Sequence, residues 1–90
     1  MYPKVSVIII AKNEPRIRYT LESLANQTVK PYEVLVVVND ASDISAEIAK
    51  VYINKLPIKI VLSETPGYGG ARKTGVEQAL GDIIVFIDAD

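Results

Sequence analysis

The 90-residue chain has no cysteine and no histidine. Disulfides, thiolate nucleophiles, a serine-histidine-aspartate triad and the usual zinc ligands are therefore excluded within it. Ten basic and eleven acidic residues give a net charge of -1, with no block of one sign. This balance excludes a nucleic-acid-binding footprint and a polybasic membrane patch. A site in this chain is therefore expected to depend on oxygen-containing side chains.

Long apolar runs are missing too. The longest, such as residues 34–38 and 83–87, are far shorter than a bilayer span, and residues 1–4 lead straight into a predicted strand rather than forming a signal peptide. We therefore expect a soluble, cytoplasmic chain. Whether the intact protein associates with a membrane stays open.

What is present is a regular alternation of apolar runs and amphipathic segments. Four runs rich in valine and isoleucine are mostly apolar on both alternating faces, as in buried parallel strands: residues 5–10, 34–38, 58–62 and 83–87. The three segments between them carry apolar residues at helical spacing, such as Ile17, Leu21 and Leu24. With right-handed crossovers, this order predicts an α/β fold, a Rossmann-like βαβαβαβ half-domain with a parallel sheet and helices on both faces.

The helix boundaries are predicted from capping residues. Asn13 is expected to cap the first helix, and Ser42 or Asp43 the second, which then runs to the Leu56-Pro57 step. Gly81 is expected as the C-terminal glycine of the third helix.

The chain stops at Asp90, directly after the fourth predicted strand. No helix follows to cover that strand, and an edge strand as apolar as residues 83–87 is usually covered or paired. We therefore expect residues 1–90 to be a truncated part of a longer domain. We also expect self-association through this strand or a nearby apolar face.

Polar residues follow all four predicted strands, which is where ligands bind in open α/β sheets. These residues are Asn13-Glu14, Asn39-Asp40, Ser63-Glu64-Thr65 and Asp88-Ala89-Asp90. Helix capping explains Asn13, Ser42 and Asp43 as well as ligand binding does. It explains Asp88 and Asp90 poorly, because no helix follows them and strand alternation puts both carboxylates on one side.

Four carboxylates are expected to approach this rim: Glu14, Asp40, Asp88 and Asp90. Clustered carboxylates repel one another unless some are protonated or a cation lies among them. In the absence of histidine and cysteine, hard oxygen ligands suit Mg²⁺ or Mn²⁺, which keep waters and share their coordination with substrate phosphates. One or two aspartates and a diphosphate would complete such an octahedron.

The third strand-to-helix turn, residues 63–70, is rich in glycine and opens a helix that carries Arg72 and Lys73. A phosphate at the helix N-terminus and a flexible turn without a ligand both explain this composition. Further along the same helix, Gly75 and Ala79 are expected to allow close packing on the sheet.

Five segments, taken together, carry a family resemblance. They are VSVIIIAKNE (5–14), LESLANQT (21–28), YEVLVVVNDASD (32–43), GGARKTGVEQALGD (69–82) and VFIDAD (85–90). Through their content, order and spacing the chain resembles the family-2 glycosyltransferases of the GT-A fold along essentially its whole length. The resemblance implies that residues 1–90 are the nucleotide-sugar-binding N-terminal half of such an enzyme, ending at its Asp-x-Asp motif.

The resemblance also implies roles for individual residues. Such an enzyme transfers a sugar with inversion, using Mn²⁺ or Mg²⁺, to an acceptor that the sequence does not reveal, whether glycan, lipid or protein. Its catalytic base is expected beyond Asp90, so the isolated chain is expected to be inactive. By resemblance, the nucleotide sugar is bound by Glu14, Asn39, Asp40, Arg72 and Asp88, and the metal by Asp90 together with Asp88.

The chain departs from the family pattern at several positions. Members often read Pro-Thr-Tyr-Asn where this chain has residues 10–13, Ile-Ala-Lys-Asn, so the hydroxyl and aromatic contacts expected near the base are missing. The identity of the nucleotide therefore stays open. Asn39 replaces a frequent aspartate, Lys73 stands where asparagine is usual, and the loop 41–43 is one residue short.

The same residues bear on several other functions. A catalytically inactive nucleotide-binding module is the main alternative for the isolated chain. A sugar nucleotidyltransferase is disfavoured because residues 11–13 offer no glycine-rich, arginine-containing loop. A dehydrogenase is disfavoured because the first turn lacks Gly-x-Gly-x-x-Gly.

Overall fold

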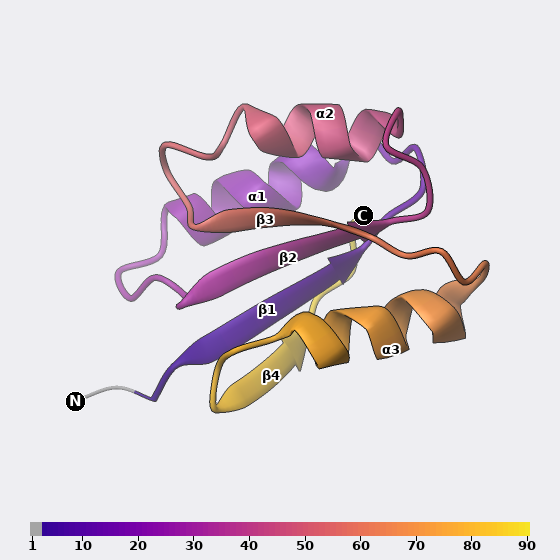
Figure 1. The fold of residues 1–90 in the computed structure, drawn as a ribbon. Coiled ribbons are helices and arrows are strands. Elements are labelled where there is room, and N and C mark those ends of the chain that lie inside the picture. Colours follow the sequence, from indigo (N-terminus) through magenta and orange to yellow (C-terminus); the bar gives the residue numbers. More distant parts are fainter. Residues whose placement is uncertain (1–2) are drawn as a thin grey trace.

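The computed structural model describes residues 3–90 as a four-stranded sheet with three helices (Figure 1). The elements in chain order are β1 (Val5–Ile10), α1 (Ile17–Ala25), β2 (Glu33–Val38), α2 (Ile44–Lys50), β3 (Ile58–Leu62), α3 (Tyr68–Gln78) and β4 (Ile83–Phe86). The predicted βαβαβαβ order is confirmed. The fourth strand ends one residue earlier than predicted, although the Ile87 N–H still donates to the Ile8 carbonyl at 3.1 Å.

The strands are all parallel and lie in the order β3-β2-β1-β4. Figure 1 shows α1 and α2 on one face of the sheet and α3 on the other, so the predicted helices on both faces are confirmed. Every residue of β2 is buried, because this central strand is covered from both sides. That placement explains its unbroken run of apolar residues after Glu33.

Each face of the sheet has its own apolar core. The face toward α1 and α2 holds the larger one, centred on Val7, Ile9, Val34 and Val36. The face toward α3 holds a smaller one, formed by Ile8, Leu35, Val37 and Ala71. A Cβ added at Gly75 would lie 2.9 Å from Ile8 Cγ2, so the glycine allows α3 to approach the sheet as predicted.

The cap predicted for α1 is wrong, and the cap predicted for α2 is confirmed. The N-cap of α1 is Arg16, whose side chain makes no capping bond. Asn13 adopts φ 45°, in the left-handed region, and its Oδ1 accepts the Ile44 N–H at 3.1 Å. Asp43 caps α2 by accepting the Ser45 N–H at 2.7 Å. Asn13 therefore caps the second helix from a distance of 31 residues in the chain.

The other two predicted helix ends are also wrong. α2 ends at Lys50, because the bonds that follow, such as Tyr52 N–H to Ala49 carbonyl, span three residues and form turns. α3 ends at Gln78 rather than at Gly81. A Cβ at Gly81 would lie 2.5 Å from Ser6 Oγ, so this glycine instead allows the turn after α3 to pack on the start of β1.

A buried carboxylate fixes that turn. Glu33, only 2% exposed, accepts hydrogen bonds at 2.6 Å from the Ser6 hydroxyl and at 2.6 Å from the Leu80 N–H. Its other oxygen lies 2.8 Å from Lys59 Nζ. Burial acts to raise the pKa of Glu33, but these bonds outweigh burial and leave the pKa below its usual value. The network ties β1, β2, β3 and the α3–β4 turn together at the amino end of the sheet.

The β4 edge is the least covered part of the sheet. Ile83, Ile84 and Val85 are between 38% and 45% exposed. A groove of about 360 Å³ lies between α1 and β4, with Leu24 and Ile87 among its mostly apolar lining. No helix within residues 3–90 combines the length and apolar character needed to cross a bilayer.

Candidate functional site

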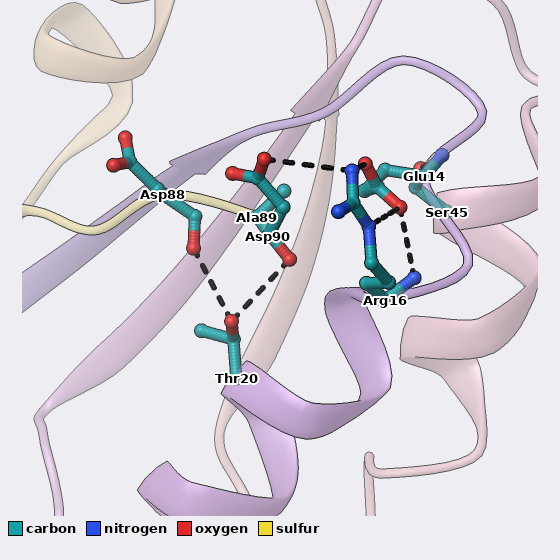
Figure 2. Close-up of polar contacts among 7 residues, drawn as sticks. All are labelled: Glu14, Arg16, Thr20, Ser45, Asp88, Ala89 and Asp90. Carbon is teal, nitrogen blue, oxygen red and sulfur yellow. Dashed lines mark hydrogen bonds and ion pairs between the residues drawn. The ribbon is translucent and has the colours of Figure 1, made fainter.

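The Asp88-Ala89-Asp90 segment extends β4 at the carboxyl edge of the sheet. Ala89 is only 8% exposed and packs in the core on the α1 side. Thr20 Oγ1 on α1 lies 3.2 Å from the Asp88 carbonyl oxygen and 3.3 Å from the Ala89 carbonyl oxygen, and donates toward them. Figure 2 shows both aspartate carboxylates on the side of the segment away from Thr20, as strand alternation predicts.

Glu14, in the loop after β1, is paired with Arg16. Its carboxylate accepts from Arg16 at 2.8 Å and 3.0 Å through the guanidinium and at 3.0 Å through the backbone N–H. These bonds lower the pKa of Glu14 to about 2. The same guanidinium lies 3.5 Å from Asp90 Oδ2 (Figure 2). Arg16 is thus the counter-charge that brings Glu14 and Asp90 to one place.

The sequence reasoning missed Arg16 and Thr20. Both lie at the start of α1, four residues apart, a spacing that puts their side chains on one side of a helix. The available signal was that spacing together with a basic residue two positions after Glu14. To use this signal, one would have to know that this side of α1 contacts the end of β4.

The predicted cluster of four carboxylates is wrong. Asp40 Oδ1 accepts the Ser42 N–H at 2.9 Å and the Ser42 hydroxyl at 2.8 Å, which lowers the pKa of Asp40. Within residues 3–90, no three acidic side chains come close enough to enclose a metal ion. The physical reason is local: Ser42 satisfies Asp40 and Arg16 satisfies Glu14. Asp88 and Asp90 remain as the pair that the structure brings to one side.

Asn39 lies in a pocket at the end of β2. Its Nδ2 donates to the carbonyl oxygens of Ser63 at 3.0 Å and Thr65 at 3.1 Å, so both amide hydrogens are used by the β3–α3 loop. The amide therefore has a set orientation, and its Oδ1 is the atom left to accept from a ligand. The pocket has a volume of about 310 Å³ and is lined by Ile10, Ala11, Lys12, Asn39, Gly67 and Tyr68.

Arg72, on α3, is positioned by an aromatic ring. Its guanidinium carbon lies 4.1 Å from the centroid of the Phe86 ring, within the range of a cation–π contact. Phe86 pairs with Ile8 and packs in the core that faces α3. Asp88 lies two residues further along the extended segment and so projects toward the same face. The arginine charge and the Asp88 carboxylate therefore lie on the same side of the sheet.

These features describe a parallel α/β domain with a small pocket, a pair of aspartates and an arginine at the carboxyl edge of its sheet. The family model described as glycosyl transferase family 2 matches residues 6–90. The chain belongs to this family, and the resemblance inferred from its sequence is confirmed.

Individual relatives agree with this assignment. The glycosyltransferase AglE of Haloferax volcanii is 40% identical over 94 residues, which cover 98% of this chain and 31% of that protein. The crystal structure of S. aureus TarS 1-349 has a TM-score of 0.86 and 36% identity, over 97% of this chain and 27% of that one.

A more distant structure carries a donor and a metal. The mannosyltransferase PcManGT from Pyrobaculum calidifontis, in complex with GDP-Man and Mn²⁺, has a TM-score of 0.79 and 26% identity, over 100% of this chain and 28% of that one. The chain spans less than a third of the length of the curated relatives named by these matches, from 13% of GlyA of Streptococcus pneumoniae to 32% of YwdF of Bacillus subtilis.

Proposed function

We propose that this chain is the donor-binding part of an inverting, metal-dependent glycosyltransferase that uses a nucleotide-diphosphate sugar. The observation that carries the proposal is the orientation of Asp88 and Asp90, on one side of the sheet edge that also holds the Asn39 pocket. TarS in complex with UDP-GlcNAc and PcManGT in complex with GDP-Man and Mn²⁺ support it. We place the catalytic base and the acceptor contacts outside residues 1–90.

The chain's own residues suggest how a donor would lie. The base enters the 310 Å³ pocket, where Asn39 Oδ1 accepts a ring N–H, as uracil and guanine offer and cytosine and adenine do not. Asp88 meets the ribose, and Arg72 meets the diphosphate. Glu14 and Asp40 stay predicted nucleoside contacts. A ligand that binds the Glu14 carboxylate must first displace the Arg16 guanidinium from it.

The residues present fit a Mg²⁺ or Mn²⁺ ion shared with the substrate. Asp88 and Asp90 are exposed carboxylates with hard oxygen donors, and such ions are often held by one or two carboxylates with phosphate oxygens and waters. A site of that kind needs no third acidic residue. When bound, the ion supplies Lewis-acid stabilisation of the leaving diphosphate. Asp90 becomes available when its exposed pair with Arg16, at 3.5 Å, separates.

Calorimetric titration of UDP and GDP, with and without Mn²⁺, tests this proposal. We expect weak binding that requires the metal and is lost in Asp88→Ala, whereas Glu47→Ala, an exposed surface change on α2, leaves it intact. Binding without metal, or binding unchanged by Asp88→Ala, contradicts the assignment of the aspartate pair.

A sugar-transfer assay separates the enzyme from its alternative, an inactive nucleotide-binding module. The isolated chain is expected to bind nucleotide without measurable transfer. Robust turnover by the 90-residue chain contradicts the placement of the base outside it.

We further propose that the isolated chain self-associates through the β4 edge. The exposed Ile83, Ile84 and Val85 and the adjoining 360 Å³ groove leave apolar surface in water. Sedimentation velocity over a concentration series is expected to report oligomers that Val85→Lys reduces. A monomer at all concentrations contradicts this proposal.

A further inference from the structure

We propose that Tyr68 is the residue on which the donor's nucleobase stacks, a binding contact supplied by the start of α3. The inference rests on the proposed function and adds a residue to it. Residues 10–12 line the pocket of about 310 Å³ at the carboxyl edge of the sheet but contribute no aromatic ring to it. Tyr68, the first residue of α3, provides one to the same pocket.

The first observation is the lining of the pocket. Of the six described residues around this 310 Å³ space, Tyr68 alone is aromatic. Ile10 and Ala11 supply apolar surface, and Asn39 and Lys12 supply polar groups. A flat ring opposite apolar atoms, with hydrogen-bonding groups at its edge, is the environment that a nucleobase needs.

The second observation is that the Tyr68 ring is uncommitted. Tyr19, Tyr32, Tyr52 and Phe86 each have a lysine or arginine over the ring, at 4.1 to 5.8 Å from the centroid. Tyr68 has no such cation among the described residues, belongs to neither core and is 59% exposed. A large apolar ring held at a pocket without intramolecular contacts of this kind is available to a ligand.

The third observation is that the loop carrying Tyr68 is fixed. Gly67 begins α3 at φ 91°, a conformation that a residue with a side chain rarely adopts. The preceding residues are held by Asn39, whose amide bonds to Ser63 and Thr65. The same hydrogen bonds therefore orient the Asn39 amide and anchor the backbone that leads into Tyr68.

Ligand-observed NMR with Mg²⁺ as the metal tests the stacking directly. A base that stacks on a tyrosine shifts upfield by the ring current, so we expect the uracil H5 and H6 of UDP to move upfield with the natural chain. Tyr68→Ala is expected to abolish the shift and to weaken UDP binding about tenfold, while Tyr68→Phe keeps both. Tyr32→Ala, at the opposite end of the sheet, is the matched control and changes neither.

Pyrophosphate separates this inference from the proposed function. Because it has no base, its metal-dependent binding is expected to be the same in Tyr68→Ala and in the natural chain. If Tyr68→Ala binds UDP as tightly as the natural chain does, the stacking role is wrong and the donor site stands. If the natural chain binds neither UDP nor pyrophosphate with Mg²⁺, the assignment of the donor site is wrong, and the stacking role is wrong with it.

Discussion

Glu33 at the amino end of the sheet and Asp88 and Asp90 at its carboxyl end are all carboxylates that follow or begin a strand, yet their surroundings differ. Glu33 is buried; one of its oxygens accepts from a hydroxyl and a backbone N–H, and the other forms an ion pair with Lys59. Asp88 and Asp90 are exposed, and only the distant contact with Arg16 reaches one of them. A carboxylate enclosed by its own chain stabilises the fold, whereas carboxylates aligned without such partners are free for a ligand.

The largest expected effect is at the amino end. Glu33→Ala leaves the Leu80 N–H and the Ser6 hydroxyl without their acceptor in a buried place, and should lower the free energy of unfolding by about 2 kcal/mol. Urea denaturation measures this. Glu47→Ala, which breaks the exposed pair with Lys50, is the control and should have no measurable effect. Equal effects of the two variants would show that burial of Glu33 contributes little.

An intermediate effect is expected where α1 meets the Asp-x-Asp segment. Thr20→Val removes the hydroxyl that donates to the carbonyls of Asp88 and Ala89 and should cost about 1 kcal/mol of stability. Because the segment loses its anchor, metal-dependent UDP binding should weaken as well. Thr20→Ser, which keeps the hydroxyl, should restore binding. A Thr20→Ser variant as weak as Thr20→Val would refute the hydrogen-bonding role.

A pH effect follows from the lowered pKa of Glu33. Its folded pKa lies below the ordinary value of 4.5, so its contribution to stability is complete above that pH and is lost as the pH falls through the folded pKa. Acid unfolding of the natural chain should therefore be steeper below about pH 4.5 than that of Glu33→Gln. Parallel stability curves for the two chains would contradict this assignment.

The smallest effect on stability is expected at the carboxyl end. Arg16→Gln removes the guanidinium donors, the largest cause of the lowered Glu14 pKa of about 2, so that pKa should rise part of the way toward 4.5, while the backbone N–H of residue 16 still lowers it. Because the pair lies at the surface, stability at neutral pH should hardly change. Carbon-detected NMR titration of the Glu14 carboxylate measures the shift. A Glu14 pKa that stays near 2 in the variant would mean that another group lowers it.

The sequence was sufficient to predict the fold because the strands and α1 carry clear apolar periods and the remaining segments alternate with them; α3 itself buries only the small residues Ala71 and Gly75, while Val76 is exposed. The sequence was insufficient for contacts between distant residues. Asn13 caps a helix 31 residues away, and Gly81 is required by Ser6, which lies 75 residues earlier. Neither relation is visible in a local pattern.

For the candidate site as well, the predictions that depended on local spacing were correct and those that depended on contacts in the folded chain were not. Strand alternation correctly predicted that Asp88 and Asp90 face one side, since this depends only on their spacing. The four-carboxylate rim failed because Ser42 and Arg16, each two residues from its partner, satisfy Asp40 and Glu14 locally. The pocket around Tyr68 was missed because its lining comes from three separate parts of the chain, residues 10–12, Asn39 and residues 67–68, which only the fold brings together.

Amide chemical-shift mapping tests the central claim, that the carboxyl edge binds a metal–nucleotide diphosphate. In ¹⁵N-labelled chain titrated with UDP and Mg²⁺, the account predicts shifts in residues 10–14, 39–40, 67–73 and 86–90, and none around Glu33 and Leu80. Shifts concentrated around Glu33 and Leu80, or shifts at the carboxyl edge that persist unchanged in Asp88→Ala, would contradict it.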